Sequence, residues 1–261
     1  MSRTKPREDG LRNPSKKFLR WDSGKQCFVY WDKDNEKSIE VSPQNIAFIV
    51  LDQLITITGF DDEKNARIWG NEVRGNKDII TMHIGKTEAG KGTHKQHRDS
   101  NKNVKFCYSV YALAKTEKGG AFELVNFQFS GASCSSWYAI VEQNGGINSI
   151  EKDDVVLGIS HVENMKKGRV EYTVPIFKVL RKGISEDAAA AADAADKLLQ
   201  RYLDAYLSGE IQRQKDEQSD ADYDDDSFDR ALEKEMPDLR GESSSQNENP
   251  FPDDDEDDVP F

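Results

Sequence analysis

The sequence has little cysteine and no long apolar run. Its three cysteines, Cys27, Cys107 and Cys134, lie far apart and are odd in number, which excludes a disulfide framework and a paired zinc spacing. No stretch approaches the roughly 18 apolar residues that a membrane span needs, and the basic, polar first residues do not read as a signal peptide. We therefore expect a protein of a reducing cytoplasm, without a membrane partner.

Positive and negative charges are distributed unevenly along the chain. The 261 residues carry a net charge of -12, but residues 1–183 hold 29 Lys and Arg against 23 Asp and Glu, whereas residues 184–261 hold 7 against 25. The basic body suggests a polyanionic partner. The acidic remainder can compete for the same surface.

The acidic part ends in a distinctive tip. Six carboxylates precede a short apolar end with an aromatic last residue: Asp253, Asp254, Asp255, Glu256, Asp257, Asp258, Val259, Pro260 and Phe261. Like charges keep such a segment extended and solvated, and proline prevents a regular helix. A solubilising tail does not need the apolar end, which a basic and apolar pocket on a partner could bind.

This tip resembles the C-terminal tip of bacterial single-stranded DNA-binding proteins, and many tailed-phage proteins of that class end similarly. The resemblance covers nine residues and agrees in position, charge run and terminal Pro260-Phe261. It implies a divergent, phage-type protein that binds and protects single-stranded DNA during replication or recombination, without strong sequence preference. It also implies recruitment of replication proteins, such as a polymerase, helicase or primase, and neither enzymatic activity nor a cofactor.

Runs of β-branched and aromatic residues predict a mainly β domain over residues 18–183. The expected strands are residues 18–21, 27–31, 45–60, 66–70, 79–84, 104–114, 122–129, 155–162 and 170–180, with a short helix within 130–144. The first two strands, and those at 104–114 and 122–129, should form hairpins. This order favours an OB-fold-like antiparallel barrel elaborated with extra hairpins.

The flanking segments differ from this domain. Residues 1–17 are expected to be a flexible basic arm and residues 210–261 a disordered acidic tail. Residues 184–209 predict an amphipathic helix that begins after Ser185 and ends at Gly209. Its packing face is expected to contain Ala188, Ala191, Ala195, Leu198, Tyr202 and Tyr206. This helix should pack on the barrel, or alternatively form a homodimer contact.

Residues 85–105 are the most basic part of the body and predict a mobile, phosphate-binding loop. Its cations are Lys86, Lys91, Lys95, Arg98, Lys102 and Lys105. Gly85, Gly90 and Lys91 have the spacing of a nucleotide-binding phosphate loop, but Gly92 replaces the required hydroxyl residue and no helix is expected to follow. Nucleotide hydrolysis is therefore not expected.

Binding of single strands also requires aromatic rings on which bases stack. The candidates are Trp21, Tyr30, Trp31, Trp69, Phe106 and Tyr108, with Arg20 and Arg67 as adjacent cations. Because side chains alternate along a strand, only one side of each strand can line a groove, and half or more of the aromatic residues should belong to the core. Trp137 is expected in the core.

Three other functions compete with this hypothesis. A strand-annealing recombination mediator would speed pairing of complementary strands, a DNA-mimicking inhibitor would not bind DNA after tail removal, and a nuclease would require a divalent metal. His94 and His97, with His83 and Cys107 nearby, could contribute to a zinc site, but sequence spacing does not define four ligands. No catalytic-triad spacing is present.

Overall fold

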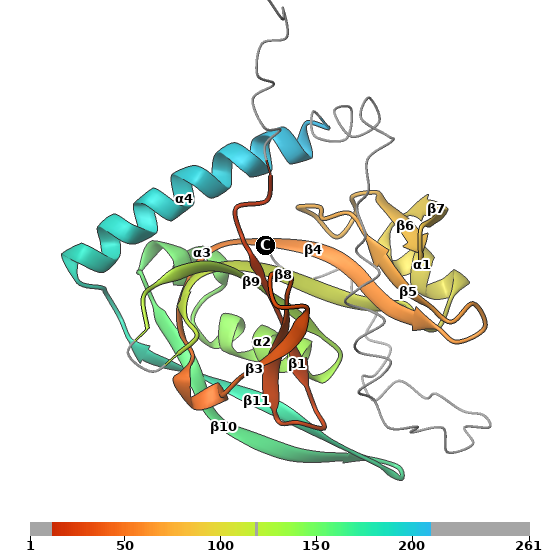
Figure 1. Cartoon of the computed structure of the whole chain (residues 1–261), viewed down its shortest axis with the longest axis horizontal. Coiled ribbons are helices and arrows are strands. Elements are labelled where there is room, and N and C mark those ends of the chain that lie inside the picture. Colours follow the sequence, from red (N-terminus) through yellow and green to blue (C-terminus); the bar gives the residue numbers. More distant parts are fainter. Residues whose placement is uncertain (1–11, 118–119, 210–261) are drawn as a thin grey trace, which may run out of the picture.

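The computed structural model describes residues 12–117 and 120–209, which form a mainly β structure (Figure 1). The strands are β1 (Lys17–Asp22), β2 (Cys27–Asp32), β3 (Lys37–Val41), β4 (Ala47–Asp61), β5 (Ala66–Gly70), β6 (Ile80–Ile84), β7 (Thr87–Gly92), β8 (Lys105–Lys115), β9 (Glu123–Ser130), β10 (Val156–Lys167) and β11 (Val170–Arg181). The helices are α1 (His94–Ser100), α2 (Ala132–Gln143), α3 (Ile147–Lys152) and α4 (Glu186–Leu207), with a 3-10 turn at Pro43–Asn45. The prediction of a mainly β domain followed by a helix is confirmed.

The described strands form one sheet in the order β3-β2-β1-β9-β8-β4-β5-β6-β7, and the β10–β11 hairpin branches from β4. The sheet is not closed, so the predicted OB-fold-like barrel is not confirmed. The pairs between the described strands are antiparallel, as predicted, except that β1 and β9 run parallel. Parallel neighbours need a long crossover connection, and strands β2–β8 supply it here.

Both expected hairpins are present. Trp21 pairs with Phe28 between β1 and β2, and Tyr108 pairs with Phe129 between β8 and β9. The long strand β4 carries a register shift between Val50 and Asp52, near the polar break in its sequence. Strands β3 and β7 were not predicted, because neither has the run of β-favouring residues that a sequence pattern requires.

The prediction of an irregular loop over residues 85–105 is wrong. Part of the segment forms β7, and another part forms α1, which begins after a capping box made by Thr93 and Gln96. His97 is buried, and its Nε2 lies 2.8 Å from the carbonyl oxygen of Ile80. This contact packs the basic helix against β6 and removes His97 from the solvent-exposed surface.

One side of the sheet, here called the core face, carries the main hydrophobic core. Leu19, Phe28, Phe48 and Phe127 project from this face and pack around Trp137 of α2. Trp137 is fully buried, as predicted, and its indole N–H donates to Gln53 Oε1 at 2.7 Å. The β10–β11 hairpin closes the same core through Leu157 and Phe177.

Helix α4 covers one end of the opposite side, here called the outer face (Figure 1). Leu199, Tyr202 and Leu203 pack against Leu54 of β4 and Tyr111 of β8. Packing of this helix on the sheet is confirmed, and the homodimer contact stays a prediction. One residue of the predicted packing face is wrong: Leu198 is 51% exposed, and its neighbour Leu199 is fully buried in its place.

A buried polar network fixes the end of α4. The hydroxyl of Tyr206 accepts from the backbone N–H of Glu72 at 2.9 Å, and the Glu72 carboxylate accepts from Tyr111 Oη at 2.8 Å and from Ser109 Oγ. Burial raises the pKa of the Glu72 carboxyl above its usual range, while the two hydroxyl donors oppose that shift. The network joins α4 to β8 and to the segment after β5.

Substitution of Leu203 by Ala should lower the free energy of unfolding by about 2–5 kcal/mol, because Leu203 is fully buried between α4 and the sheet. The control is Leu198→Ala, on the same helix but 51% exposed, which should change stability by less than about 0.5 kcal/mol. Urea denaturation followed by circular dichroism measures both. Equal losses would contradict this packing of α4.

Stability should fall as the pH rises from about 4.5 to about 7, in part because of Glu151. Burial raises the pKa of Glu151 from its ordinary value of 4.5 to about 7, with Asp52 as a second cause. In this window the unfolded chain has released a proton that the folded protein retains, so deprotonation favours unfolding. Glu151→Gln should reduce the difference between urea midpoints at pH 5 and pH 7.5, whereas Glu142→Gln, at an exposed position of α2, should not.

Candidate nucleic-acid interface

Helix α4 leaves part of the outer face uncovered, and a row of side chains crosses neighbouring strands there. Trp69 of β5 pairs with Thr58 of β4, which pairs in turn with Lys105 of β8. Two residues along the strands, Arg67 pairs with Phe60. The β-sheet alternation therefore places these residues on the same side.

Aromatic side chains are unusually exposed on this face. Phe18 of β1, Phe60 of β4 and Trp69 of β5 are 37%, 38% and 39% exposed. Phe18 and Trp69 adjoin the core residues Leu19 and Ile68 along their strands, so they point to the outer face. Phe60 lies there too, because it pairs with Arg67, two residues from Trp69 on β5. A solvated sheet face normally carries polar residues, so these rings make the outer face a candidate binding surface.

Cations accompany the rings. Lys105 is exposed, and Arg20 and Arg67 are half-buried on the same face. Lys91 of β7 lies opposite Thr81 and pairs with Glu88 at 3.8 Å. The outer face thus combines positive charge with aromatic surface.

Two contacts hold the exposed ring of Trp69 in place. Its indole stacks on the imidazole of His83 with a centroid distance of 4.2 Å and an interplanar angle of 9°, and its N–H donates to the carbonyl oxygen of Gly85 at 2.8 Å. The two residues are cross-strand neighbours on β5 and β6. These contacts fix the plane of an exposed aromatic ring in advance of any ligand.

Four predicted stacking residues lie on the core face instead. Trp21 packs on Phe28, and its indole N–H donates to the carbonyl oxygen of Thr173 at 2.8 Å. Tyr30 is buried in the main core, whereas Phe106 and Tyr108 are half-buried and pack against the core beneath β5 and β6. Trp31 lies on the outer face at its β3 end, half-buried opposite Ser38.

The remaining predicted cations lie outside the strands of the outer face. Lys95 and Arg98 are exposed on α1, and Lys86 and Lys102 occupy turns. On α1, His94 packs edge-on against Phe106 at 4.9 Å, and burial, followed by the charge of Arg98, lowers the pKa of His94. The row of outer-face cations and these α1 cations are therefore separate candidate surfaces on opposite sides of β8.

The glycines of the predicted loop do not form a phosphate cradle. Gly90 and Gly92 lie within β7, although a helix does follow them, contrary to expectation. The zinc hypothesis has no geometric support in the part of the chain that the structure describes, since it contains no group of three or more His, Cys, Asp or Glu side chains placed to hold a metal.

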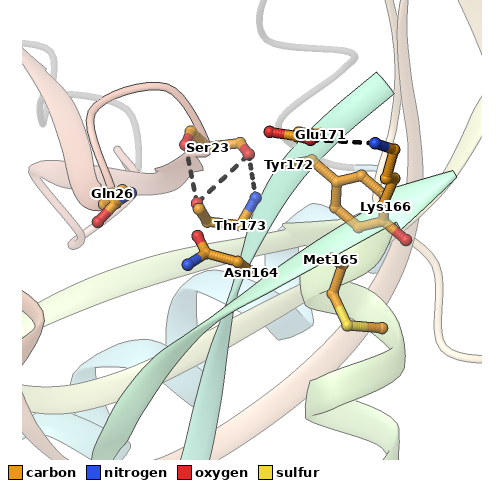
Figure 2. A pocket seen from close by; sticks show the side chains of 8 residues that line it. All are labelled: Ser23, Gln26, Asn164, Met165, Lys166, Glu171, Tyr172 and Thr173. Atoms are coloured by element: carbon orange, nitrogen blue, oxygen red, sulfur yellow. Dashed lines mark hydrogen bonds and ion pairs between the residues drawn. The ribbon is translucent and has the colours of Figure 1, made fainter. Parts of the chain in front are cut away.

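A second surface feature is a groove of about 490 Å³ between the β1–β2 turn and the β10–β11 hairpin (Figure 2). Thr173 and Ser23 join its two sides, since the N–H of Thr173 donates to Ser23 Oγ at 2.6 Å and Thr173 Oγ1 donates to the Ser23 carbonyl oxygen at 2.8 Å. Its one cation, Lys166, pairs with Glu171 at 3.2 Å. The groove lining carries no net charge, so the outer face is the better polyanion site.

Sequence reasoning missed three residues of the outer face: Phe18, Phe60 and His83. Phe18 and Arg20 alternate with the core residues Leu19 and Trp21, so alternation within β1 could have identified Phe18. The position of His83 beside Trp69 depends on the pairing of β5 with β6, which a single sequence does not define.

No family model, curated protein or solved structure matches the chain. None of the helices within residues 12–117 and 120–209 is long and apolar enough to cross a membrane. The predicted partner-binding tip, residues 253–261, lies outside the described residues, as do residues 1–11 of the predicted basic arm.

Proposed function

We propose that the protein binds single-stranded DNA through the outer face, protects it during phage replication or recombination, and is not an enzyme. The observation that carries this proposal is the group of exposed rings and cations on β4, β5 and β8, of which Trp69, Arg67 and Lys105 are the central members. Aromatic rings can stack on any base, and cations contact the backbone of any sequence. This chemistry suits binding without strong sequence preference.

The spacing within the row supports the same ligand. Two strand spacings separate Trp69 from Lys105, which is about 10 Å, and two residues separate it from Arg67 along β5, which is about 7 Å. A base on the indole would thus have a cation within reach in two directions. The OB-fold interpretation belongs to this proposal, since OB-folds also bind oligonucleotides on an exposed strand face.

The C-terminal tip supplies the second part of the proposal. Residues 253–258 are all acidic, and Val259, Pro260 and Phe261 follow. We propose that DNA displaces the acidic segment from the basic body and makes the tip available to replication proteins. The resemblance of the tip to those of single-stranded DNA-binding proteins supports this role.

Lysine footprinting tests the location of the interface. Saturating 20-nucleotide oligo-dT should slow acylation of Lys105, which is exposed on the outer face, because bound DNA covers its amine. Lys95, which is also exposed but lies on α1, serves as the internal control and should react at an unchanged rate. Mass spectrometry of tryptic peptides measures both rates. Protection of Lys95 without protection of Lys105 would place the interface on α1.

A further inference from the structure

The stack of Trp69 on His83 leaves one face of the indole available. His83 covers the face toward β6 at 4.2 Å, and the indole N–H is engaged by Gly85. The 39% exposure of Trp69 therefore arises from its opposite face and free edge. Because His83 lies on the β6 side, the free face is directed back over β4, where Thr58 is the paired residue.

Thr58 has less side-chain bulk than its two neighbours in the row. It is the short side chain between Trp69 on β5 and Lys105 on β8, and the three are consecutive in the cross-strand row. The backbones of Trp69 and Lys105 are about 10 Å apart, so the two longer side chains flank Thr58. Lys105 makes no ion pair with a described residue, so its ammonium group is available to a phosphate.

We propose that these three residues, Trp69, Thr58 and Lys105, form a slot that takes one unpaired nucleobase and determines selectivity for single strands over duplex. His83 is its positioning residue, since it holds the indole plane without touching the base. This inference rests on the proposed function and refines it. A base in duplex DNA is stacked on both faces and must first be extruded, which costs a few kcal/mol. The slot therefore adds affinity only for unpaired strands.

Four variants test the slot: Trp69→Ala, Thr58→Leu, His83→Ala and His83→Phe. Binding to fluorescein-labelled 20-nucleotide oligo-dT and to a 20-base-pair duplex is measured by anisotropy, and thermal unfolding confirms that each variant is folded. Trp69→Ala removes the stacking ring, and Thr58→Leu fills the slot with a side chain that offers no ring. Both should weaken oligo-dT binding about 5- to 150-fold, with duplex binding nearly unchanged.

The His83 pair separates positioning from general stability. His83→Ala should weaken oligo-dT binding and reduce the near-ultraviolet circular dichroism of Trp69, obtained as the difference between each protein and its Trp69→Ala counterpart. His83→Phe restores a ring under the indole and should recover both signals. Loss of binding in His83→Phe, despite a recovered dichroism signal, would overturn the positioning role.

The outcomes distinguish the two proposals. If wild-type protein binds neither oligo-dT nor duplex, the proposed function fails. If wild-type protein binds oligo-dT but Trp69→Ala and Thr58→Leu bind it equally well, the proposed function stands and the slot is wrong. Equal losses for oligo-dT and duplex would also overturn the slot, because the residues would then act without regard to base pairing.

Discussion

Replacement of Arg67 and Lys105 together by Glu is expected to weaken binding of single-stranded DNA by about 100-fold. Hydrogen bonds to charged groups contribute about 1.5–3 kcal/mol each, and 1.4 kcal/mol corresponds to a factor of ten. Both residues lie on the outer face, one on each side of Thr58 and Phe60. The loss of two phosphate contacts should also reduce the slope of log K against log salt by about 1.4. Anisotropy titrations from low to moderate salt measure both quantities.

The matched control is the double reversal Lys95→Glu and Arg98→Glu. It changes the net charge by the same amount, and both residues are exposed on α1, outside the strands of the outer face. We expect a loss of less than about tenfold, from the long-range field alone. If the α1 reversal weakens binding more than the outer-face reversal does, the interface includes the basic helix and the assignment to the outer face is wrong.

Deletion of residues 251–261 is expected to strengthen DNA binding at low salt, by about tenfold or more. The deleted segment contains six consecutive carboxylates, and residues 1–183 have a surplus of Lys and Arg. The acidic segment competes with DNA for that positive surface, so its removal should raise the association rate. The gain should disappear near 1 M salt, where the Debye length is about 3 Å. A gain that is independent of salt would contradict electrostatic competition.

Removal of Phe261 alone should separate the two roles of the tip. DNA binding should remain unchanged because the carboxylates remain. Capture of replication proteins on an immobilised peptide of residues 245–261 should fall about 30-fold, since a terminal aromatic anchor of this kind contributes about 2 kcal/mol or more. Phe251→Ala in the same peptide is the control, because Phe251 precedes the acidic run. Equal capture with and without Phe261 would show that the tip is not the anchor.

Local sequence patterns predicted most of the strands and the helices α2 and α4, but not how these elements are placed relative to one another. The β1–β2 and β8–β9 hairpins join strands that are close in sequence, so alternation and a turn were enough to predict them. The parallel pairing of β1 with β9 joins residues about one hundred positions apart, such as Leu19 and Phe127. Nothing in either strand specifies that partner, and the open sheet that results was not expected.

In the candidate site, too, the residues could be predicted from the sequence but their placement could not. Residue type alone identified Trp69, Arg67 and Lys105. Their proximity on the outer face depends on the register of β4 with β5 and β8. Phe106 and Tyr108 adjoin the basic segment in sequence, yet alternation turns them to the core face. For α1, the capping box of Thr93 and Gln96 was a visible signal. The high charge and absence of an apolar stripe in this short helix obscured it.

The central claim is that the protein prefers unpaired DNA and holds it largely by charge. The direct measurement is a titration of labelled 20-nucleotide oligo-dT and a 20-base-pair duplex with full-length and tail-deleted protein, at several salt concentrations. We expect tighter binding of the single strand at every salt concentration, with log K falling linearly as log salt rises. Duplex binding equal to or tighter than single-strand binding, or no DNA binding by either protein at low salt, would contradict it.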